Sequence, residues 1–401
     1  MRVSTAQFYI QNGLQMSNQQ AGVNEQVNYI SSGKRVITAK DDAVAYGTLA
    51  GYKNDLANIE KYQRNITQAE NHNSLIDTSL ANAEGIMNEL KDLMLQANSG
   101  VRSDDDLASI AQQASHSLQQ ILDIANSQDE TGGYVFAGYQ IDDAPFVLQA
   151  DNTVNYRGDN GVRELQIAKN VSIATNQSGE QVFQKVPNAL GDFTPTYNTN
   201  TSGIGVESAV IADPSVYNSA VNPPDFTFNF TTATDLSITD GAGNVTNIAG
   251  YVPGQTIAFN GIEVKLSGNP LPGDNFSLTP EENISVFDTL KSAIDWIENK
   301  TSAGDDPQVQ VDFNQTLEQL SDAMNHLTSR RAQSGINLQV IDRQKSNHLD
   351  TELYLSSGRS SIEDLDFAKA ISTFEQSKVA LQAAQQSFTQ VQSLSLFNYI
   401  R

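Results

Sequence analysis

The stretch from Tyr52 to Ala97, YKNDLANIEKYQRNITQAENHNSLIDTSLANAEGIMNELKDLMLQA, repeats its apolar residues every seven positions. One line of the repeat, with a polar register breaker in its middle, consists of Tyr52, Ile59, Ile66, Asn73, Leu80, Met87 and Met94. A companion line three residues on holds Ile76, Ala83, Leu90 and Ala97. Two apolar lines at this spacing are typical of a helix packed along its length against another helix. We therefore expect one helix from Asp41 to about Asn98, roughly 85 Å long at 1.5 Å per residue.

Capping signals mark the ends of this helix and the start of the next one. Gly33 breaks the preceding segment, and Thr38 with Asp41 fits a capping box. After a break at Ser99-Gly100, Ser103 is a candidate N-cap, followed by acidic residues at 104–106 where the helix dipole favours negative charge. The second helix would bury a stripe of alternating three- and four-residue steps, formed by Leu107, Ala111, Ala114, Leu118, Ile121 and Ala125.

The same heptad arithmetic returns late in the chain. Multiples of seven separate Phe313, Leu320, Leu327, Ile341 and Leu355, with Leu317, Met324 and Leu338 between them. We expect this long late helix to lie against the early one. A shorter helix introduces it, with one apolar face formed by Phe287, Leu290, Ile294 and Ile297.

Both ends of the chain carry weaker helices of the same kind, and neither can bury its apolar stripe alone. The stripes contain Met16, Val23, Val27 and Ile30 near the start and Phe367, Phe374, Leu381, Phe388 and Val391 near the end. Small-residue hinges at Ser31-Ser32-Gly33 and Ser356-Ser357-Gly358 set the two helices off from the rest. This symmetry predicts that the terminal segments pair into one module and present an assembly interface. Because their hydrophobicity is low, we expect them to be mobile in the free monomer and to fold on assembly.

Between about Tyr134 and Pro280 the heptad pattern gives way to short runs of β-branched and aromatic residues, which are typical of strands. Turn pairs split these runs at Asn160-Gly161, Asp240-Gly241 and Asn260-Gly261, which predicts hairpins. The stretch from Pro187 to Pro224 is dense in Asn, Thr, Ser, Gly and Pro, so we interpret it as a surface loop, a possible join between two small β subdomains.

Composition excludes several classes of function. The 401 residues contain 47 Asp and Glu against 24 Lys and Arg, and the net charge of −23 argues against nucleic acid or an anionic membrane as a partner. The chain has no cysteine, which removes disulfide scaffolds, thiolate metal sites and cysteine nucleophiles. It shows neither the apolar stretch of a secretory signal near its start nor a run of about 18 apolar residues. We expect a soluble protein whose export bypasses the signal peptide.

No group of residues has the pattern of an active site. The four histidines, His72, His116, His326 and His348, include no metal-binding pair, and helix-surface or seam positions explain them better. The acidic run at 104–106 lacks the glycine and distal glutamate of a calcium loop, so capping is the better interpretation. The glycines at 132, 133 and 138 lack the lysine and spacing of a phosphate-binding loop. We therefore expect no catalytic, cofactor-binding or metal-binding residue and no enzyme activity.

Two segments at opposite ends carry a family resemblance. SSGKRVITAKDDAVAYGTLAGY at 31–52 resembles the N-terminal signature of flagellins and flagellin-like proteins, and SSIEDLDFAKAISTFEQSKVALQAAQQ at 360–386 resembles their C-terminal signature. Within that family, the start MRVST, GGYVFAGYQIDDAPF at 132–146, GDNFSLTPEENISVFDTL at 273–290 and the ending SLFNYI are similar to the subunits that join hook and filament. Ala43 is more typical of flagellin, the filament subunit, which stays open as the alternative. An enzyme or carbohydrate-binding module in the β-rich region is a third hypothesis.

The resemblance implies an α+β fold of elongated, multi-layer, flagellin-like architecture. It implies a terminal helical module forming the inner tube (1–40 and 358–401), a long-helix bundle (41–133 and 283–357) and a β-rich inserted outer domain (134–282). The implied partners are the first hook-associated protein, flagellin, the filament cap protein during assembly, an export chaperone and other copies of the chain in a ring layer. The implied location is the extracellular flagellum, reached through the flagellar type III export apparatus.

Overall fold

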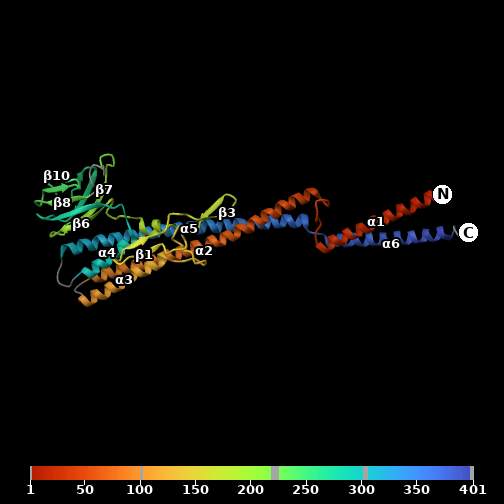
Figure 1. The fold of residues 1–401 in the computed structure, drawn as a ribbon, viewed down its shortest axis with the longest axis horizontal. Helices are drawn as coiled ribbons and strands as arrows, with labels where there is room; N and C mark the ends of the chain where they lie inside the picture. Colours follow the sequence, from red (N-terminus) through yellow and green to blue (C-terminus); the bar gives the residue numbers. More distant parts are fainter. Residues whose placement is uncertain (1, 100–102, 218–224, 301–305, 398–401) are drawn as a thin grey trace. The chain divides into compact units, whose positions relative to one another are not determined.

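A computed structural model describes residues 2–99, 103–217, 225–300 and 306–397, and for 2–6, 8 and 391–397 it describes the backbone alone. Long helices from both ends of the chain flank a β-rich insertion in the sequence, which confirms the predicted α+β class (Figure 1). The helices are α1 (Arg2–Ser32), α2 (Ala43–Asn98), α3 (Asp104–Ala125), α4 (Val286–Asn299), α5 (Pro307–Glu363) and α6 (Phe367–Phe397). None of the described helices is long and apolar enough to cross a membrane.

The chain divides into two compact units. Residues 1–64 and 343–401 form the terminal unit, and residues 65–342 form the central unit. The division falls inside α2 and α5, so these two helices contribute to both units. The three-domain division expected from the sequence stays a prediction.

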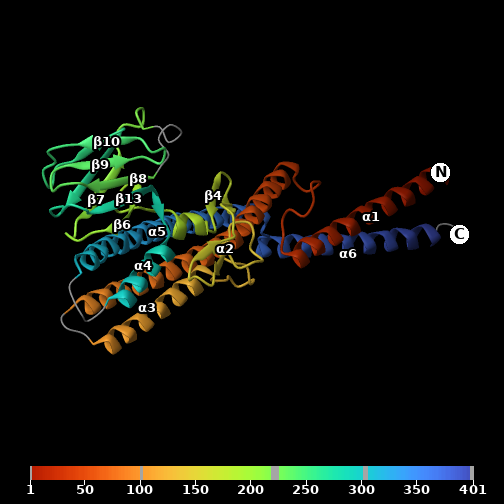
Figure 2. The same cartoon turned by 60° about the vertical axis from the view of Figure 1, so that its left-hand side comes forward.

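In the terminal unit, α1 and α6 pack against each other in opposite directions (Figure 1 and Figure 2). Tyr9 and Phe388 meet edge to face, with ring centroids 5.8 Å apart. Gly33 lies at the other end of the pair, where a Cβ atom would stand 3.6 Å from Phe367. The two terminal segments thus pair along their length, as their matching apolar stripes predict.

The two linkers of the terminal unit are joined to each other. Helix α1 ends at Ser32, and Gly33 takes a φ of +68° that favours glycine. Backbone hydrogen bonds then run from Arg35 N to Glu363 O (2.7 Å) and from Leu365 N to Gly33 O (3.0 Å). The short α1–α2 and α5–α6 linkers therefore form a single β-bridge, in which Lys34 pairs with Asp364.

The hinge predicted at Ser356-Ser357-Gly358 is wrong, because α5 continues through it to Glu363. A Cβ atom at Gly358 would lie 3.0 Å from Cε2 of Tyr52. This glycine therefore permits close packing of α5 on α2 and does not break the helix. The break comes after Glu363, and Asp366 accepts a hydrogen bond from Lys369 N at the start of α6.

The start of α2 also differs from the sequence-based expectation. Asp42 is the capping residue, since its Oδ1 accepts hydrogen bonds from the backbone N–H groups of Val44 (3.1 Å) and Ala45 (2.9 Å). The Asp41 carboxylate instead accepts a hydrogen bond from the preceding Thr38 N at 2.8 Å, and the backbone N–H of Asp41 donates to Thr38 O. These bonds close a turn before the helix. The capping box assigned to Thr38 and Asp41 is therefore a separate turn next to the true cap.

In the central unit, α3 and α4 lie beside the parts of α2 and α5 that belong to this unit (Figure 2). Buried residues of these helices and of the first β segments form one core. Ser103 is the N-cap of α3, as predicted, and it forms in addition a full capping box with Asp106. Arg331 of α5 donates to Asp77 (3.0 Å) and Glu84 (3.1 Å) of α2, so the late helix lies against the early one. The predicted stripe of α4 is buried, as shown by Phe287, Leu290, Ile294 and Ile297.

Two antiparallel sheets share a second core, rich in phenylalanine. One sheet has the order β10-β9-β8-β13-β6 and the other β11-β12-β7. Their strands are β6 (Phe193–Thr199), β7 (Gly205–Ile211), β8 (Phe226–Phe230), β9 (Leu236–Thr239), β10 (Val245–Ile248), β11 (Ile257–Phe259), β12 (Ile262–Ser267) and β13 (Asn275–Pro280). Phe228 and Phe276 stack across β8 and β13 with centroids 4.7 Å apart.

Shorter elements link this domain to the helices. They are β1 (Phe146–Leu148), β2 (Val154–Tyr156), β3 (Glu164–Ala168), β4 (Val171–Ala174), the π-helix η1 (Glu180–Gln184), β5 (Val186–Pro187) and β14 (Asn283–Ile284). β1 pairs with β2, β3 with β4, and β5 with β14, all antiparallel.

The loop interpretation of 187–224 is wrong where the structure describes it, because β6 and β7 lie there. β6 buries Phe193 and exposes Thr196 and Asn198. β7 buries Val206 and Ala209 on either side of a register shift at Glu207, so neither strand stands out in a composition rich in polar residues. The Asp240-Gly241 and Asn260-Gly261 pairs do connect paired strands. Asn160-Gly161 instead lies in the loop between β2 and β3, which belong to different hairpins.

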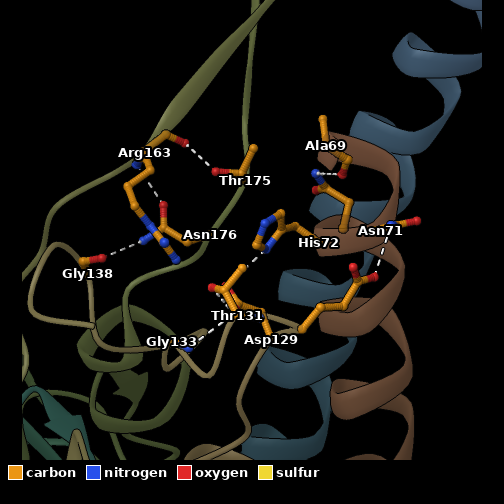
Figure 3. Close-up of polar contacts among 12 residues, drawn as sticks. Ala69, Asn71, His72, Asp129, Thr131, Gly133, Gly138, Arg163, Thr175 and Asn176 are labelled. Carbon is orange, nitrogen blue, oxygen red and sulfur yellow. Dashed lines mark hydrogen bonds and ion pairs between the residues drawn. The ribbon is translucent and has the colours of Figure 1, made fainter. Parts of the chain in front are cut away.

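Polar side chains fasten the loops before and after these hairpins (Figure 3). Asp129 accepts hydrogen bonds from Gly133 N (3.0 Å) and from the backbone and hydroxyl of Thr131 (2.9 and 2.6 Å). Asn176 accepts from Arg163 N at 2.7 Å and donates to Gly161 O at 2.9 Å. These short-range bonds hold the irregular segments on the side of α2, where His72 Nδ1 lies 3.8 Å from Asp129.

Candidate assembly surface

The paired terminal helices carry almost no charge. In the 31 residues of α1 the charged side chains are Arg2 and Glu25, and in the 31 of α6 they are Lys369, Glu375 and Lys378. Glutamine, asparagine, serine and threonine supply most of the remaining polar positions. A long helix pair of this composition can approach identical pairs without charge repulsion.

Most of the predicted interface residues lie in the seam between α1 and α6. Met16, Val23, Ile30, Phe374 and Phe388 are half-buried. Leu381 is 8% exposed and so is the most enclosed of the set. These positions hold the helix pair together within one subunit.

Two other predicted residues stay exposed, Val27 at 45% and Phe367 at 51%. Val391 falls outside the residues whose side chains the structure describes. Of the predicted set with described side chains, Val27 and Phe367 are thus the most available to another molecule. The assignment of the whole set to an assembly interface stays a prediction.

Sequence reasoning missed a second group of apolar side chains on these helices. Ile10, Leu14, Ile371 and Val379 are 63%, 61%, 50% and 60% exposed. Ile10 and Leu14 are four residues apart, on the side of α1 opposite the seam. The sequence did contain a signal for this group, because Ile10 and Leu14 form an apolar pair off the heptad line. The heptad stripe is the stronger pattern, and the prediction was based on it alone.

Exposed apolar side chains concentrate in the terminal unit as a whole. More than half of the large apolar side chains that are exposed in the described part of the chain lie there, although this unit holds less than a third of the residues. Beyond α1 and α6 they include Val44, Leu349, Leu353 and Tyr354. Exposed apolar groups gathered in one region mark an interaction surface.

An ion cluster stabilises the linkers below the helix pair. Glu363 is 5% exposed, and its Oε1 lies 2.8 Å from both Lys34 Nζ and Lys53 Nζ. Hydrogen bonds from Lys34 and Lys53 hold the pKa of Glu363 below its usual value. One carboxylate thereby ties the α1–α2 linker and α2 to the end of α5.

A tyrosine and an aspartate hold the other end of the α1–α2 linker. Burial, followed by its hydrogen bond to Asp41, raises the pKa of Tyr29 to about 12. Backbone hydrogen bonds from Thr38 and Ile37 lower the pKa of the Asp41 carboxyl group. These contacts fix the chain between α1 and α2, so the position of α1 is determined by several bonds at once.

The histidines lie in ordinary helix positions. His348 stacks on Tyr62 at 5.7 Å, and His326 lies 2.9 Å from Gln181 O, with its pKa lowered mainly by burial. Among the described residues no group of three His, Cys, Asp or Glu side chains could hold a metal ion. The feature that points to a function is therefore the group of exposed apolar side chains in the terminal unit, which favours association.

Comparisons with known proteins agree with this arrangement. Family models of the bacterial flagellin N-terminal and C-terminal helical regions match residues 3–141 and 317–400, together more than half of the chain. Flagellar hook-associated protein 3 of Escherichia coli (strain K12) is 24% identical over 398 residues, which are 99% of this chain and 99% of that protein.

A solved structure shares the fold over most of its length. The crystal structure of the flagellar junction protein from Legionella pneumophila is 25% identical with a TM-score of 0.65, and the match covers 79% of this chain and 99% of that one. By contrast, phase 1 flagellin of Salmonella naestved matches over 122 residues at 25% identity, 30% of this chain and 24% of that protein. Full-length similarity is thus to hook-associated and junction proteins, which are structural parts of the flagellum.

Proposed function

This chain belongs to the bacterial flagellin family, and we propose that it is the structural subunit that joins the flagellar hook to the flagellin filament. The observation that carries the proposal is the terminal helix pair, which is nearly uncharged and keeps apolar side chains exposed on its outside. Full-length similarity to hook-associated protein 3 supports the junction role over that of the filament subunit.

The exposed side chains and the side chains in the seam of the helix pair have different roles. Ile10, Leu14, Ile371 and Val379, with the predicted Val27 and Phe367, contact neighbouring subunits. The seam residues Met16, Val23, Ile30, Phe374, Leu381 and Phe388 form the pair that presents them, and Val391 extends the same stripe. Folding of the helix pair is coupled to association of the subunits, because these exposed apolar side chains are covered only when copies stack. Such head-to-tail contacts build helical tubes, of which this subunit forms one layer.

The partners follow from this place in the tube. The first hook-associated protein lies on one side, flagellin on the other, and the filament cap assembles ahead. Residues 1–40 with 358–401 form the inner tube, 41–133 with 283–357 the bundle around it, and 134–282 the outer face. The chain is exported through the flagellar type III apparatus with an export chaperone, and it has no enzymatic role.

Deletion of the gene followed by complementation tests the proposal. Loss of the chain leaves bare hooks and releases flagellin into the medium, and the wild-type chain restores filaments. A chain with Leu14→Gln and Ile371→Gln fails to restore them although it is secreted, because two exposed contacts are lost. The matched control Gln11→Ala, at an exposed polar position of α1, restores filaments normally.

The alternative role as filament subunit predicts a different outcome. Cells lacking the chain would then keep hooks with a functional junction, and flagellin would not spill into the medium. Filaments of normal length in the deletion strain would remove the junction role and leave the family assignment alone.

A further inference from the structure

The chain contains three Asn-Gly pairs, at 12–13, 160–161 and 260–261. In such a pair the backbone nitrogen of the glycine can attack the side-chain carbonyl carbon of the asparagine, because glycine has no Cβ atom to hinder the approach. Whether it does so depends on two features of the fold. The asparagine amide must be free to turn toward the nitrogen, and that nitrogen must not be held in another hydrogen bond.

Asn260 meets both requirements. It forms the two-residue turn between β11 and β12 with Gly261, at φ values of +46° and +79°. Its side chain is exposed. In the described structure neither the amide of Asn260 nor the N–H of Gly261 makes a hydrogen bond, whereas Gly261 O accepts one from Asp213 N at 3.0 Å.

The other two pairs are protected. Asn160 accepts a hydrogen bond from the Ser178 hydroxyl and donates to the Glu180 carboxylate, and Gly161 N donates to Asp159 at 2.6 Å. Asn12 lies inside α1, where the N–H of Gly13 is part of the helix ladder. At Asn160 at least two bonds must open before the reaction, which slows it by about tenfold or more.

We propose that Asn260 is a site of spontaneous covalent modification, the deamidation of an exposed Asn-Gly turn. A bond forms between Gly261 N and Cγ of Asn260, the Cγ–Nδ2 bond breaks, and Nδ2 leaves as ammonia with the proton of the Gly261 nitrogen. Water then opens the five-membered imide to aspartate or isoaspartate. No enzyme and no reagent besides water is required.

The products change the tip of the β domain as the protein ages. Either product adds a negative charge beside the acidic turn that begins at Asp213. Isoaspartate also adds one carbon to the backbone of a tightly packed turn, in which a Cβ atom at Gly261 would lie 2.6 Å from Asp213 O and 2.7 Å from Tyr217 N. The contact between the β11–β12 turn and residues 213–217 therefore loosens in the older subunits.

Peptide mapping by mass spectrometry tests the proposal on the full chain. The folded protein is incubated at mildly alkaline pH, and the conversion of amide to acid is followed at Asn12, Asn160 and Asn260. We expect Asn260 to react about tenfold faster than Asn160. Asn12 stays intact only while α1 is helical, so its rate reports the folding of the terminal helices and does not enter this comparison. A sample unfolded in urea provides the intrinsic rates, at which all three pairs react.

The variant Asn260→Gln supplies the matched control, because its longer side chain forms the imide poorly. It should remove the acidic species that accumulates in the wild-type chain and leave the other two sites unchanged. Equal or faster reaction at Asn160 in the folded protein would overturn the assignment. So would an intact Asn260 after the unfolded chain has reacted there.

Discussion

Asn73 shows how one polar residue can serve inside an apolar seam. It is 1% exposed, donates to Ala174 O at 2.9 Å and accepts from the Asn337 amide at 3.0 Å. The sequence marked it as a break in the heptad line of α2, but could not show that its partners come from α5 and from the end of β4. Its place in the helix was predictable, whereas its bonds depend on chain segments roughly 100 and 260 residues away.

The variant Asn73→Ala should lower the free energy of unfolding of the central unit by about 1 to 2 kcal/mol, because Ala174 O and the Asn337 amide, both half-buried, lose their bonds. Guanidinium titration followed by fluorescence measures this, since the single tryptophan, Trp296, is buried in that unit. Asn82→Ala, at an exposed position of the same helix, is the control and should be nearly neutral. A loss below 0.5 kcal/mol, within the range of ordinary surface substitutions, would show that water replaces the lost bonds.

Glu363 makes the linker junction sensitive to acid. Because the pKa of the Glu363 carboxyl group is lowered in the folded chain, the stability that its ion pairs contribute is complete above the ordinary pKa of 4.5. This stability is lost as pH falls through the folded value. Glu363→Gln should therefore weaken the junction by about 1 kcal/mol at neutral pH and flatten its decline in acid. Hydrogen exchange at the amides of Arg35 and Leu365, both bonded across the bridge, measures this. Glu375→Gln, in an exposed pair with Lys378, is the control and should leave exchange at these two amides unchanged.

At the scale of helices, α1 and α6 pair through one side, the seam, and present exposed apolar side chains on the other side. Leu381 lies in the seam, whereas Val379 points outward at 60% exposure. Leu381→Ala should lower the stability of the helix pair by about 2 kcal/mol, visible as lost helicity in far-ultraviolet circular dichroism on heating. Val379→Ala should leave the helicity unchanged and weaken association of the full chain in sedimentation. Identical effects of the two variants on helicity would mean that the seam and the outer face are not separate.

The helices were predictable from the sequence and the linkers between them were less so. Heptad lines and the Ser103 cap placed α2 and α3 to within a few residues, since periodicity and capping are local properties. Gly358 misled because a glycine in a helix can serve a hinge or close packing, and only the position of Tyr52 distinguishes the two. The outer residues Ile10 and Leu14 were missed because they lie off the heptad line, and the heptad line predicts only the side of the helix that its partner covers.

The charge of the whole molecule is unevenly divided. The terminal unit contains 13 Lys and Arg and 11 Asp and Glu, a net charge of +2, whereas the central unit has 11 against 36, a net charge of −25. The unit that carries the proposed contacts is therefore nearly neutral, and the other unit repels its copies. Charge repulsion between central units keeps free subunits dispersed, and the nearly neutral terminal helices can still contact those of a neighbour.

Self-association of the full chain should accordingly strengthen with salt. The screening length falls from about 30 Å at 0.01 M to about 10 Å at 0.1 M ionic strength, which weakens repulsion between central units but leaves apolar contacts in place. Sedimentation velocity in low and high sodium chloride should show a rising assembled fraction, and Leu14→Gln with Ile371→Gln should abolish the rise. Association that weakens with salt would mean that ion pairs drive it. The exposed apolar side chains of α1 and α6 would then not be the contact that holds neighbouring copies together.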